Sequence, residues 1–360
     1  MTILGYEFSM NFVHLLLAFT TSVFVSLFSI PVIIQVANTK SLMDEPNQRS
    51  SHSNKIPRLG GLAIFASVLL SFAVWGHFAI DKLQYVIGSL VILFFTGLKD
   101  DVFSISPMAK LSAQIAASAI VVIGSGVQIS SFFGLAGIYS IPDWLSLGVT
   151  IFIFVVINNA FNLIDGIDGL AGGLGIISTS FFGWYFYETN HIALAILAAA
   201  LVGALAGFLR FNFDKNRKIF MGDTGSLLMG FIVSVFVIKF IQINESPVYT
   251  PNYIANAPII AILVLIIPLF DTLRVFLIRI LNGRSPFSPD RNHIHHILID
   301  KNLTHLQASI VLYITNILII IAGVTLFQYC SISISTLILL SLFVLFIALF
   351  HKNRPKQKSQ

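Results

Sequence analysis

The feature of this chain that most constrains its fold is a series of long apolar stretches separated by short polar segments. Inside a bilayer every backbone N–H and C=O group must be hydrogen-bonded within the protein, so an apolar stretch of about 17 to 25 residues crosses it as an α-helix. Eleven stretches approach this length: residues 11–34, 59–80, 83–98, 109–128, 144–164, 172–187, 191–209, 225–243, 256–279, 308–328 and 331–350. The sequence therefore predicts an all-α, polytopic transmembrane helical bundle of about ten or eleven spans, with residues 1–350 as a single integral membrane domain and residues 351–360 as a basic tail.

The composition excludes several other classes of protein. Hydrophobic residues make up 56% of the chain and charged residues 10%, whereas soluble domains carry about 25% charged residues. A single cysteine, Cys330, excludes a disulfide framework and a cysteine-based zinc site. The first residues lack the basic n-region and the small-residue cleavage site of a secretory signal, so we expect no removable signal peptide.

The distribution of basic residues predicts the orientation of the bundle. When eleven spans are threaded through the membrane, one set of loops and helix ends holds nineteen of the 21 Lys and Arg residues, and the other set holds Lys82 and Lys239. The positive-inside rule makes the first set cytoplasmic. The N-terminus is then outside and the C-terminus cytoplasmic, and the basic charge needs no nucleic-acid partner to explain it.

Polar clusters stand at the predicted cytoplasmic ends of the spans, where ionisable groups are costly and so point to function. The first cluster is the pair Asp100 and Asp101 in the segment GLKDDVFSISPMAK. Two adjacent carboxylates ionise together at low cost only beside a cation or hydrogen-bond donors. A solvated loop that caps the next span is the alternative.

A second cluster lies in the segment NNAFNLIDGIDGLAGG. Asn159, Asn162 and Asp165 recur every three residues and therefore lie near one face of the last turns of a helix, and Asp168 continues the series. Oxygen ligands on adjacent turns suit a hard cation such as Mg²⁺, which also takes phosphate oxygens and water. The alternative is a helix terminus with capping residues.

The third cluster centres on Asp223, which stands between glycines in the segment FNFDKNRKIFMGDTGSLLMG. A carboxylate that opens a helix could ligate a metal ion, and the free N–H groups of that helix start could face a phosphate. A simple N-cap is the alternative for Asp223, and positive-inside charge is the alternative for the basic residues before it.

A fourth cluster crowds Arg291, His293, His295 and His296 into one loop of the segment RSPFSPDRNHIHHILID. Arginine presents a planar fork to phosphate oxygens, and histidines can donate to phosphates. The spacing lacks the H-E-x-x-H pattern of zinc proteases, which favours anion binding over a metal site. A solvated loop is the alternative.

Two further segments carry weaker signals. In DEPNQRSSHSNKIPRLGG, the residues His52, Lys55 and Arg58 are spaced by three, and the segment alone reads as a polar loop. Asp271 and Arg274 stand at i and i+3 inside a predicted span, where a structural ion pair is expected, and Pro268 should kink that span.

Taken together, these segments resemble the polyprenyl-phosphate N-acetylhexosamine-1-phosphate transferases, in the same order and from about residue 40 to 305. The segments SPFSPDRNHIHH and IPRLGG resemble the corresponding segments of the undecaprenyl-phosphate N-acetylglucosamine-1-phosphate transferases. These enzymes start O-antigen, enterobacterial common antigen and teichoic-acid linkage units. The phospho-N-acetylmuramoyl-pentapeptide transferases of peptidoglycan synthesis usually have contiguous histidines and a TPTMGG-like segment, and they remain the alternative branch. From a different class, a cation-coupled transporter would place its site near the bilayer midplane, often within repeats, and is disfavoured.

The resemblance implies a reaction. A sugar-1-phosphate passes from a UDP-N-acetylhexosamine to undecaprenyl phosphate with release of UMP, at the cytoplasmic face of the bacterial inner membrane. N-acetylglucosamine is the default sugar, with N-acetylgalactosamine and 6-deoxy sugars left open. Mg²⁺ is the implied cofactor, with Mn²⁺ as an alternative, and a homodimer is one alternative for the oligomeric state.

The resemblance also implies roles for the candidate residues. Asp223 and Asn162 match the metal ligands, and Asp100 and Asp101 match the catalytic pair, with Asp100 as the general base toward the lipid phosphate. Direct displacement is preferred, and a covalent aspartyl intermediate stays open.

The remaining candidates are expected to bind substrate: Asp165, Asp168, Asn212, Phe220, Arg291, His293, His295, His296 and Lys55. The resemblance places Asp168, Asn212 and Phe220 at the uracil. It places Arg291 and the three histidines at the sugar diphosphate, and Lys55 at a phosphate.

Overall fold

The computed structural model describes residues 2–40, 42, 56–76, 82–245, 252–285 and 292–351, and over these residues it contains thirteen helices and no strand. The helices are α1 (Thr2–Lys40), α2 (Gly60–Trp75), α3 (Leu83–Phe103), α4 (Pro107–Ser125), α5 (Asp143–Ile164), α6 (Leu170–Glu188), α7 (Ile192–Asn212), α8 (Gly222–Ile243), α9 (Ala257–Val264), α10 (Ile266–Leu281), α11 (Ile294–Asp300), α12 (His305–Phe327) and α13 (Ile332–His351). The predicted all-α class is confirmed.

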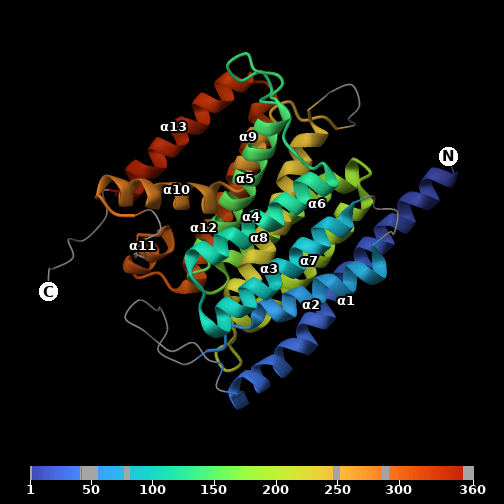
Figure 1. Cartoon of the computed structure of the whole chain (residues 1–360), viewed down its shortest axis with the longest axis vertical. Coiled ribbons are helices and arrows are strands. Elements are labelled where there is room, and N and C mark those ends of the chain that lie inside the picture. Colours follow the sequence, from blue (N-terminus) through green and yellow to red (C-terminus); the bar gives the residue numbers. More distant parts are fainter. Residues whose placement is uncertain are drawn as a thin grey trace.

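The helices form one bundle around α8, with α1 along one edge and α13 along the opposite edge (Figure 1). Nearly every side chain of α8 from Thr224 to Ile241 is buried. A helix that is apolar on all sides belongs in the interior of such a bundle. The first turn of α8 is therefore held by neighbours on several sides, which makes it a rigid platform.

Seven of these helices are long and apolar enough to cross a membrane, namely α1, α4, α5, α7, α8, α12 and α13, and the bent pair of α9 and α10 would make eight. The predicted spans at 59–80, 83–98 and 172–187 coincide with α2, α3 and α6, which pack in the same bundle without being among the seven. The chain is therefore a multi-pass membrane protein.

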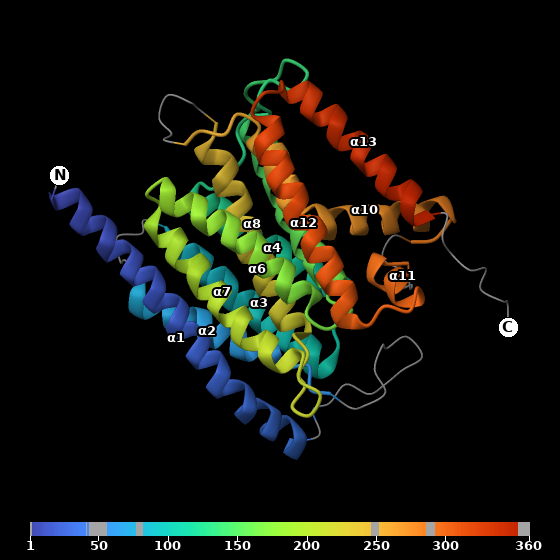
Figure 2. The same ribbon diagram turned by 180° about the vertical axis from the view of Figure 1, so that it is seen from behind.

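One predicted span is broken. Residues 256–279 form two helices, α9 and α10, whose axes differ by 80° across Leu265. The kink predicted for this span is confirmed, and it falls at Leu265, so that Pro268 lies in the first turn of α10, where its missing N–H has no helical partner to lose. As a result α10 lies across the direction of its neighbours, and it runs between α12 and α13, which diverge from each other (Figure 2).

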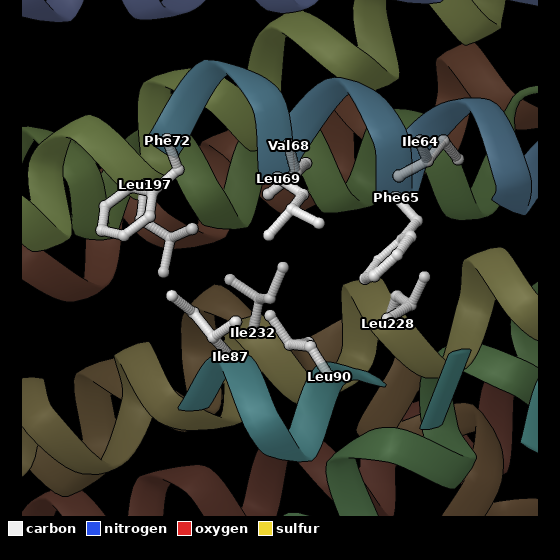
Figure 3. Close-up of a pocket in the computed structure, with 10 residues that line it drawn as sticks. All are labelled: Ile64, Phe65, Val68, Leu69, Phe72, Ile87, Leu90, Leu197, Leu228 and Ile232. Carbon is white, nitrogen blue, oxygen red and sulfur yellow. The ribbon is translucent and has the colours of Figure 1, made fainter. Parts of the chain in front are cut away.

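A small cavity lies between α2, α3, α7 and α8 and is lined only by hydrocarbon side chains, among them Phe65, Leu90 and Ile232 (Figure 3). It offers no hydrogen-bonding group to a phosphate or a sugar. The polar chemistry of the chain therefore lies elsewhere, at one end of the bundle.

Small residues bring α1 and α7 close together. Ser22 Oγ donates to the carbonyl of Ala200 at 2.6 Å, and Ser26 Oγ donates to that of Ala204 at 3.1 Å. A Cβ atom added to Gly203 would lie 2.4 Å from the carbonyl oxygen of Phe19. Close backbone approach through glycine and serine is a common way to join helices in a membrane.

We predict that Gly203→Ala lowers the free energy of unfolding by about 1–3 kcal/mol, because the added methyl group forces the two helices apart. The measurement is unfolding in detergent micelles. Gly88→Ala is the matched control, since a Cβ at Gly88 meets nothing within 4 Å, and it should leave stability unchanged or slightly higher. Equal losses in the two variants would contradict the close-packing account.

Candidate active site

The candidate active site forms where the end of α3 meets the start of α8. Asp101, in the last turn of α3, accepts hydrogen bonds from Asp223 N at 2.7 Å, Thr224 N at 2.9 Å and Thr224 Oγ1 at 2.5 Å. The first N–H groups of a helix have no partner within that helix. Asp101 supplies partners to two of them and so anchors the start of α8.

Glycines make this junction tight. Gly222 has φ +72°, and a Cβ there would lie 2.1 Å from the carbonyl oxygen of Arg58 and 2.7 Å from the Asp101 carboxylate. A Cβ at Gly97 of α3 would lie 2.5 Å from Thr224 Cα. Only glycine meets both the conformation and the spacing at Gly222.

The start of α2 joins the same junction through backbone hydrogen bonds. Phe220 N donates to Pro57 O, Gly60 N donates to Phe220 O, and Gly61 N donates to Met221 O, at 2.9, 2.9 and 2.8 Å. Residues 57–61 are thereby fixed beside the residues that lead into α8.

Lys110 connects two of the predicted acidic clusters. Its Nζ lies 2.8 Å from Asp100 Oδ2 and 2.7 Å from Asp223 Oδ2. Pro107 begins α4, and Ser106 Oγ caps it by accepting from Ala109 N at 3.2 Å, which turns Lys110 back toward the aspartates. From sequence Lys110 was counted only among the cytoplasmic charges, because no local spacing links it to Asp223 on α8.

Asn162 completes this group from the last turn of α5. Its Nδ2 donates to Asp223 Oδ1 and, at 2.9 Å, to Ser226 Oγ. Asn159, on the preceding turn, instead donates to Gln114 Oε1 at 2.7 Å. The structure thus brings Asp100, Asp101, Asn162 and Asp223 together and leaves Asn159 outside.

Asp165 ends α5 beside the same group. Burial and, to a smaller extent, the nearby Asp223 and Asp101 carboxylates raise the pKa of Asp165 to about 7. Like charges this close are stabilised by a cation. The site therefore has an excess of negative charge that a metal ion would offset.

The oxygen donors present fit a hard cation. Among the residues that the structure describes, no three His, Cys, Asp or Glu side chains are grouped as a metal site. The Asp223 carboxylate and the Asn162 amide are adjacent, however, and Mg²⁺ usually takes only one or two protein carboxylates together with waters and substrate phosphates. Such a donor set suits Mg²⁺ bound with its substrate.

The loop after α5 is held from two sides. Asp168 Oδ2 accepts from Lys218 Nζ at 2.6 Å and from His305 Nδ1 at 3.0 Å. Burial alone would raise the pKa of Asp168, but the hydrogen bond from His305 and the pairing with Lys218 hold it below its ordinary value. His305 was not among the residues predicted from sequence, because nothing local to the segment before α12 links it to Asp168.

Asn212 and Phe220 lie beside this loop. Asn212 is buried, its Oδ1 accepts from Gly169 N at 2.6 Å, and its Nδ2 donates to Ile219 O at 2.8 Å. The Phe220 ring is half-buried, with Lys218 Nζ 5.7 Å from its centre. Asn212 thus connects the two loops, while the aromatic ring of Phe220 lies near Lys218, the residue that pairs with Asp168.

The histidine segment rests on a buried ion pair. Asp271 Oδ1 accepts from Arg274 Nη2 at 2.9 Å, as the i, i+3 spacing predicted, and from Ile294 N at 2.9 Å. Asp271 Oδ2 lies 2.7 Å from His293 Nδ1, and Arg274 also donates to Asn292 O. Breaking a buried pair of this kind costs far more than forming it contributes, so Asp271 and Arg274 fix the segment in place.

The histidines lie against the loop after α5. The rings of His293 and His295 are parallel, with centroids 5.6 Å apart. A Cβ at Gly166 would lie 2.2 Å from His295 Nε2. Burial and the neighbouring His296 hold the pKa of His295 well below its ordinary value, so His295 is neutral. Arg291 and Lys55 lie outside the residues that the structure describes.

Fold and site together define a multi-pass helical membrane protein with a carboxylate-rich site at one end of its bundle. The family model for glycosyl transferase family 4 matches residues 83–241. These residues run from α3 to α8. They include Asp100 and Asp101, Asp165 and Asp168, and Asp223.

Curated relatives extend the match over most of the chain. A probable undecaprenyl-phosphate N-acetylglucosaminyl 1-phosphate transferase of Bacillus subtilis (strain 168) is 30% identical over 93% of this chain and 89% of its own length. Undecaprenyl-phosphate alpha-N-acetylglucosaminyl 1-phosphate transferases of Yersinia pestis and Escherichia coli (strain K12) are 31% and 30% identical, over 86% and 81% of this chain and 85% and 78% of theirs. The chain belongs to glycosyl transferase family 4.

We predict that the two adjacent aspartates differ in what they contribute to stability. Asp101→Asn should lower the free energy of unfolding by about 1–3 kcal/mol, because an amide cannot accept all the hydrogen bonds that the carboxylate accepts. Asp100→Asn should cost less than about 1 kcal/mol, because the amide oxygen can still accept from Ile105 N and Lys110 keeps its ion pair with Asp223. Unfolding in detergent without metal measures both, and a larger loss for Asp100→Asn would contradict the anchoring role of Asp101.

Proposed function

We propose that the chain transfers N-acetylglucosamine-1-phosphate from UDP-N-acetylglucosamine to undecaprenyl phosphate and releases UMP. The observation that carries this proposal is the convergence of Asp100, Asn162, Asp223 and Lys110 at one end of the bundle. The names of the relatives supply the substrates.

The proposed reaction is a displacement at phosphorus. An oxygen of undecaprenyl phosphate attacks the phosphorus that carries the sugar, and a new P–O–P linkage forms. The bond from that phosphorus to the bridging oxygen breaks, and UMP leaves with the electron pair. A phosphomonoester has its second pKa near about 6, so the attacking phosphate is largely dianionic at neutral pH. Its approach to a diphosphate therefore requires positioning and charge compensation more than deprotonation.

The site residues suit these tasks. Asp100 would take or orient a proton on the acceptor phosphate, and Lys110 would offset negative charge from its position between Asp100 and Asp223. Asp223 and Asn162 would hold Mg²⁺, with Mn²⁺ as a substitute. The metal ion, when bound, supplies charge compensation to the diphosphate. Asp101 would act indirectly, because it fixes the start of α8 and thereby positions Asp223.

The substrate-binding residues are proposed for the donor. Asp168 and Phe220 would meet the base, and Asn212 would shape that subsite by fixing Gly169. Asp165 and the histidines His293, His295 and His296 would line the path of the sugar diphosphate, with Arg291 and Lys55 as further phosphate contacts.

We also propose that the site faces the cytoplasm of a bacterium across its inner membrane. Basic residues gather at the site end of the bundle, while Lys82 and Lys239 lie at the other end, as the positive-inside rule requires of a cytoplasmic face. A soluble nucleotide sugar and a lipid-anchored acceptor can meet only at such an interface.

The experiment mixes the purified protein with undecaprenyl phosphate, Mg²⁺ and labelled UDP-N-acetylglucosamine and follows extraction of the label into lipid. We expect transfer that a chelator abolishes. Asp223→Asn should lower kcat by at least about a hundredfold, because a ligand of the charge-compensating ion is lost. Glu188→Gln, an exposed carboxylate at the far end of α6, is the control and should keep wild-type activity.

Transfer from UDP-N-acetylmuramoyl-pentapeptide alone would contradict the donor assignment and move the chain to the peptidoglycan reaction. A folded protein that transfers from no nucleotide sugar would overturn the proposed function.

A further inference from the structure

Three side chains on one face of α12 form hydrogen bonds to the loop that carries Asp168. His305, Ser309 and Tyr313 recur at every fourth residue and so lie above one another on the helix. Ser309 Oγ donates to Asp168 O at 2.9 Å, and the Tyr313 hydroxyl donates to Gly169 O. The loop after α5 is therefore held by a helix more than a hundred residues later in the sequence.

His305 engages the side chain of Asp168 rather than its backbone. An ionised carboxylate only accepts hydrogen bonds, so His305 Nδ1 is the donor across its 3.0 Å distance to Oδ2. Lys218 Nζ donates to the same Oδ2 at 2.6 Å. Within the described part of the chain no hydrogen bond is made to the other oxygen, Oδ1, although the Asp168 side chain is only 14% exposed to solvent.

The residues around Asp168 indicate what kind of group Oδ1 accepts from. A partly buried carboxylate oxygen is normally hydrogen-bonded, and the half-buried ring of Phe220 lies beside the lysine that holds Oδ2. An aromatic face next to a fixed acceptor suits a planar heterocycle with an N–H on its edge. The ring nitrogen N3 of uracil carries a hydrogen, whereas N3 of cytosine is itself an acceptor.

We propose that His305 is a positioning residue for the nucleotide: with Lys218 it holds Asp168 Oδ2, so that Oδ1 is presented to the N3–H of a uracil ring. Lysine is a flexible point charge, while the imidazole stands at the rigid start of α12 and fixes the plane of the carboxylate. The inference rests on the proposed function for its nucleotide donor, and it assigns specificity to a residue outside the acidic clusters.

Steady-state transfer and direct binding of UMP to the full-length protein in detergent test this inference. His305→Ala should raise KM for UDP-N-acetylglucosamine and weaken UMP binding about tenfold, the effect of one hydrogen bond to a charged group, with kcat changed less than about twofold. CMP should bind the wild-type protein weakly, because N3 of cytosine cannot donate to the carboxylate. His305→Ala should therefore not weaken CMP binding as it weakens UMP binding. His305→Asn, whose amide can donate from nearly the place of Nδ1, should recover most of the affinity for UMP.

Gln307→Ala is the matched control. Gln307 Oε1 caps the same helix start by accepting from Thr304 N at 2.9 Å and does not touch Asp168, so UMP affinity should stay within about twofold of wild type. Equal losses in Gln307→Ala and His305→Ala, a fall in kcat with unchanged KM, or no recovery in His305→Asn would each overturn the inference. His305→Phe replaces His305→Ala if the alanine variant fails to fold. Wild-type protein that binds UMP but transfers no sugar would overturn the proposed function and leave the inference standing.

Discussion

The site depends on how Asp101 holds the first turn of α8. Three hydrogen bonds from Asp223 and Thr224 to one carboxylate join the end of α3 to the most buried helix of the bundle. Because Gly97 and Gly222 have no side chains, the two helices meet closely enough for this contact. Asp223 is thereby fixed where α4 and α5 bring Lys110 and Asn162 to it.

Charge balance explains the rest of the arrangement. Several carboxylates face one another at the end of an apolar bundle, with Lys110 between two of them. A second, buried pair of Asp271 and Arg274 holds the histidine segment on the other side of the loop after α5. The first group is left short of positive charge, as suits a cation and phosphates, while the second is neutralised and structural.

Much of the fold and the acidic part of the site could be predicted from sequence, because both arise from local patterns. Apolar length marked the helices, and the three-residue spacing placed Asn162 near Asp165. A kink of the span 256–279 was predicted from Pro268, but its exact place at Leu265 could not be, since proline in the first turn of a helix and proline at a kink look alike in sequence. Lys110 and His305 were missed because each acts on a carboxylate from another helix, and no local spacing encodes such a contact.

The metal site at the start of α8 is tested most directly by measuring Mn²⁺ binding in the presence of UDP-N-acetylglucosamine. Electron paramagnetic resonance detects the bound ion. We expect one Mn²⁺ per chain that Mg²⁺ displaces, since both ions favour carboxylate, amide and water oxygens. Asp223→Asn and Asn162→Ala should each weaken that site at least about tenfold, while Glu188→Gln, at the far end of α6, should leave the metal-bound spectrum unchanged. Stoichiometric Mn²⁺ binding that persists at full affinity in Asp223→Asn would contradict the metal site at the start of α8.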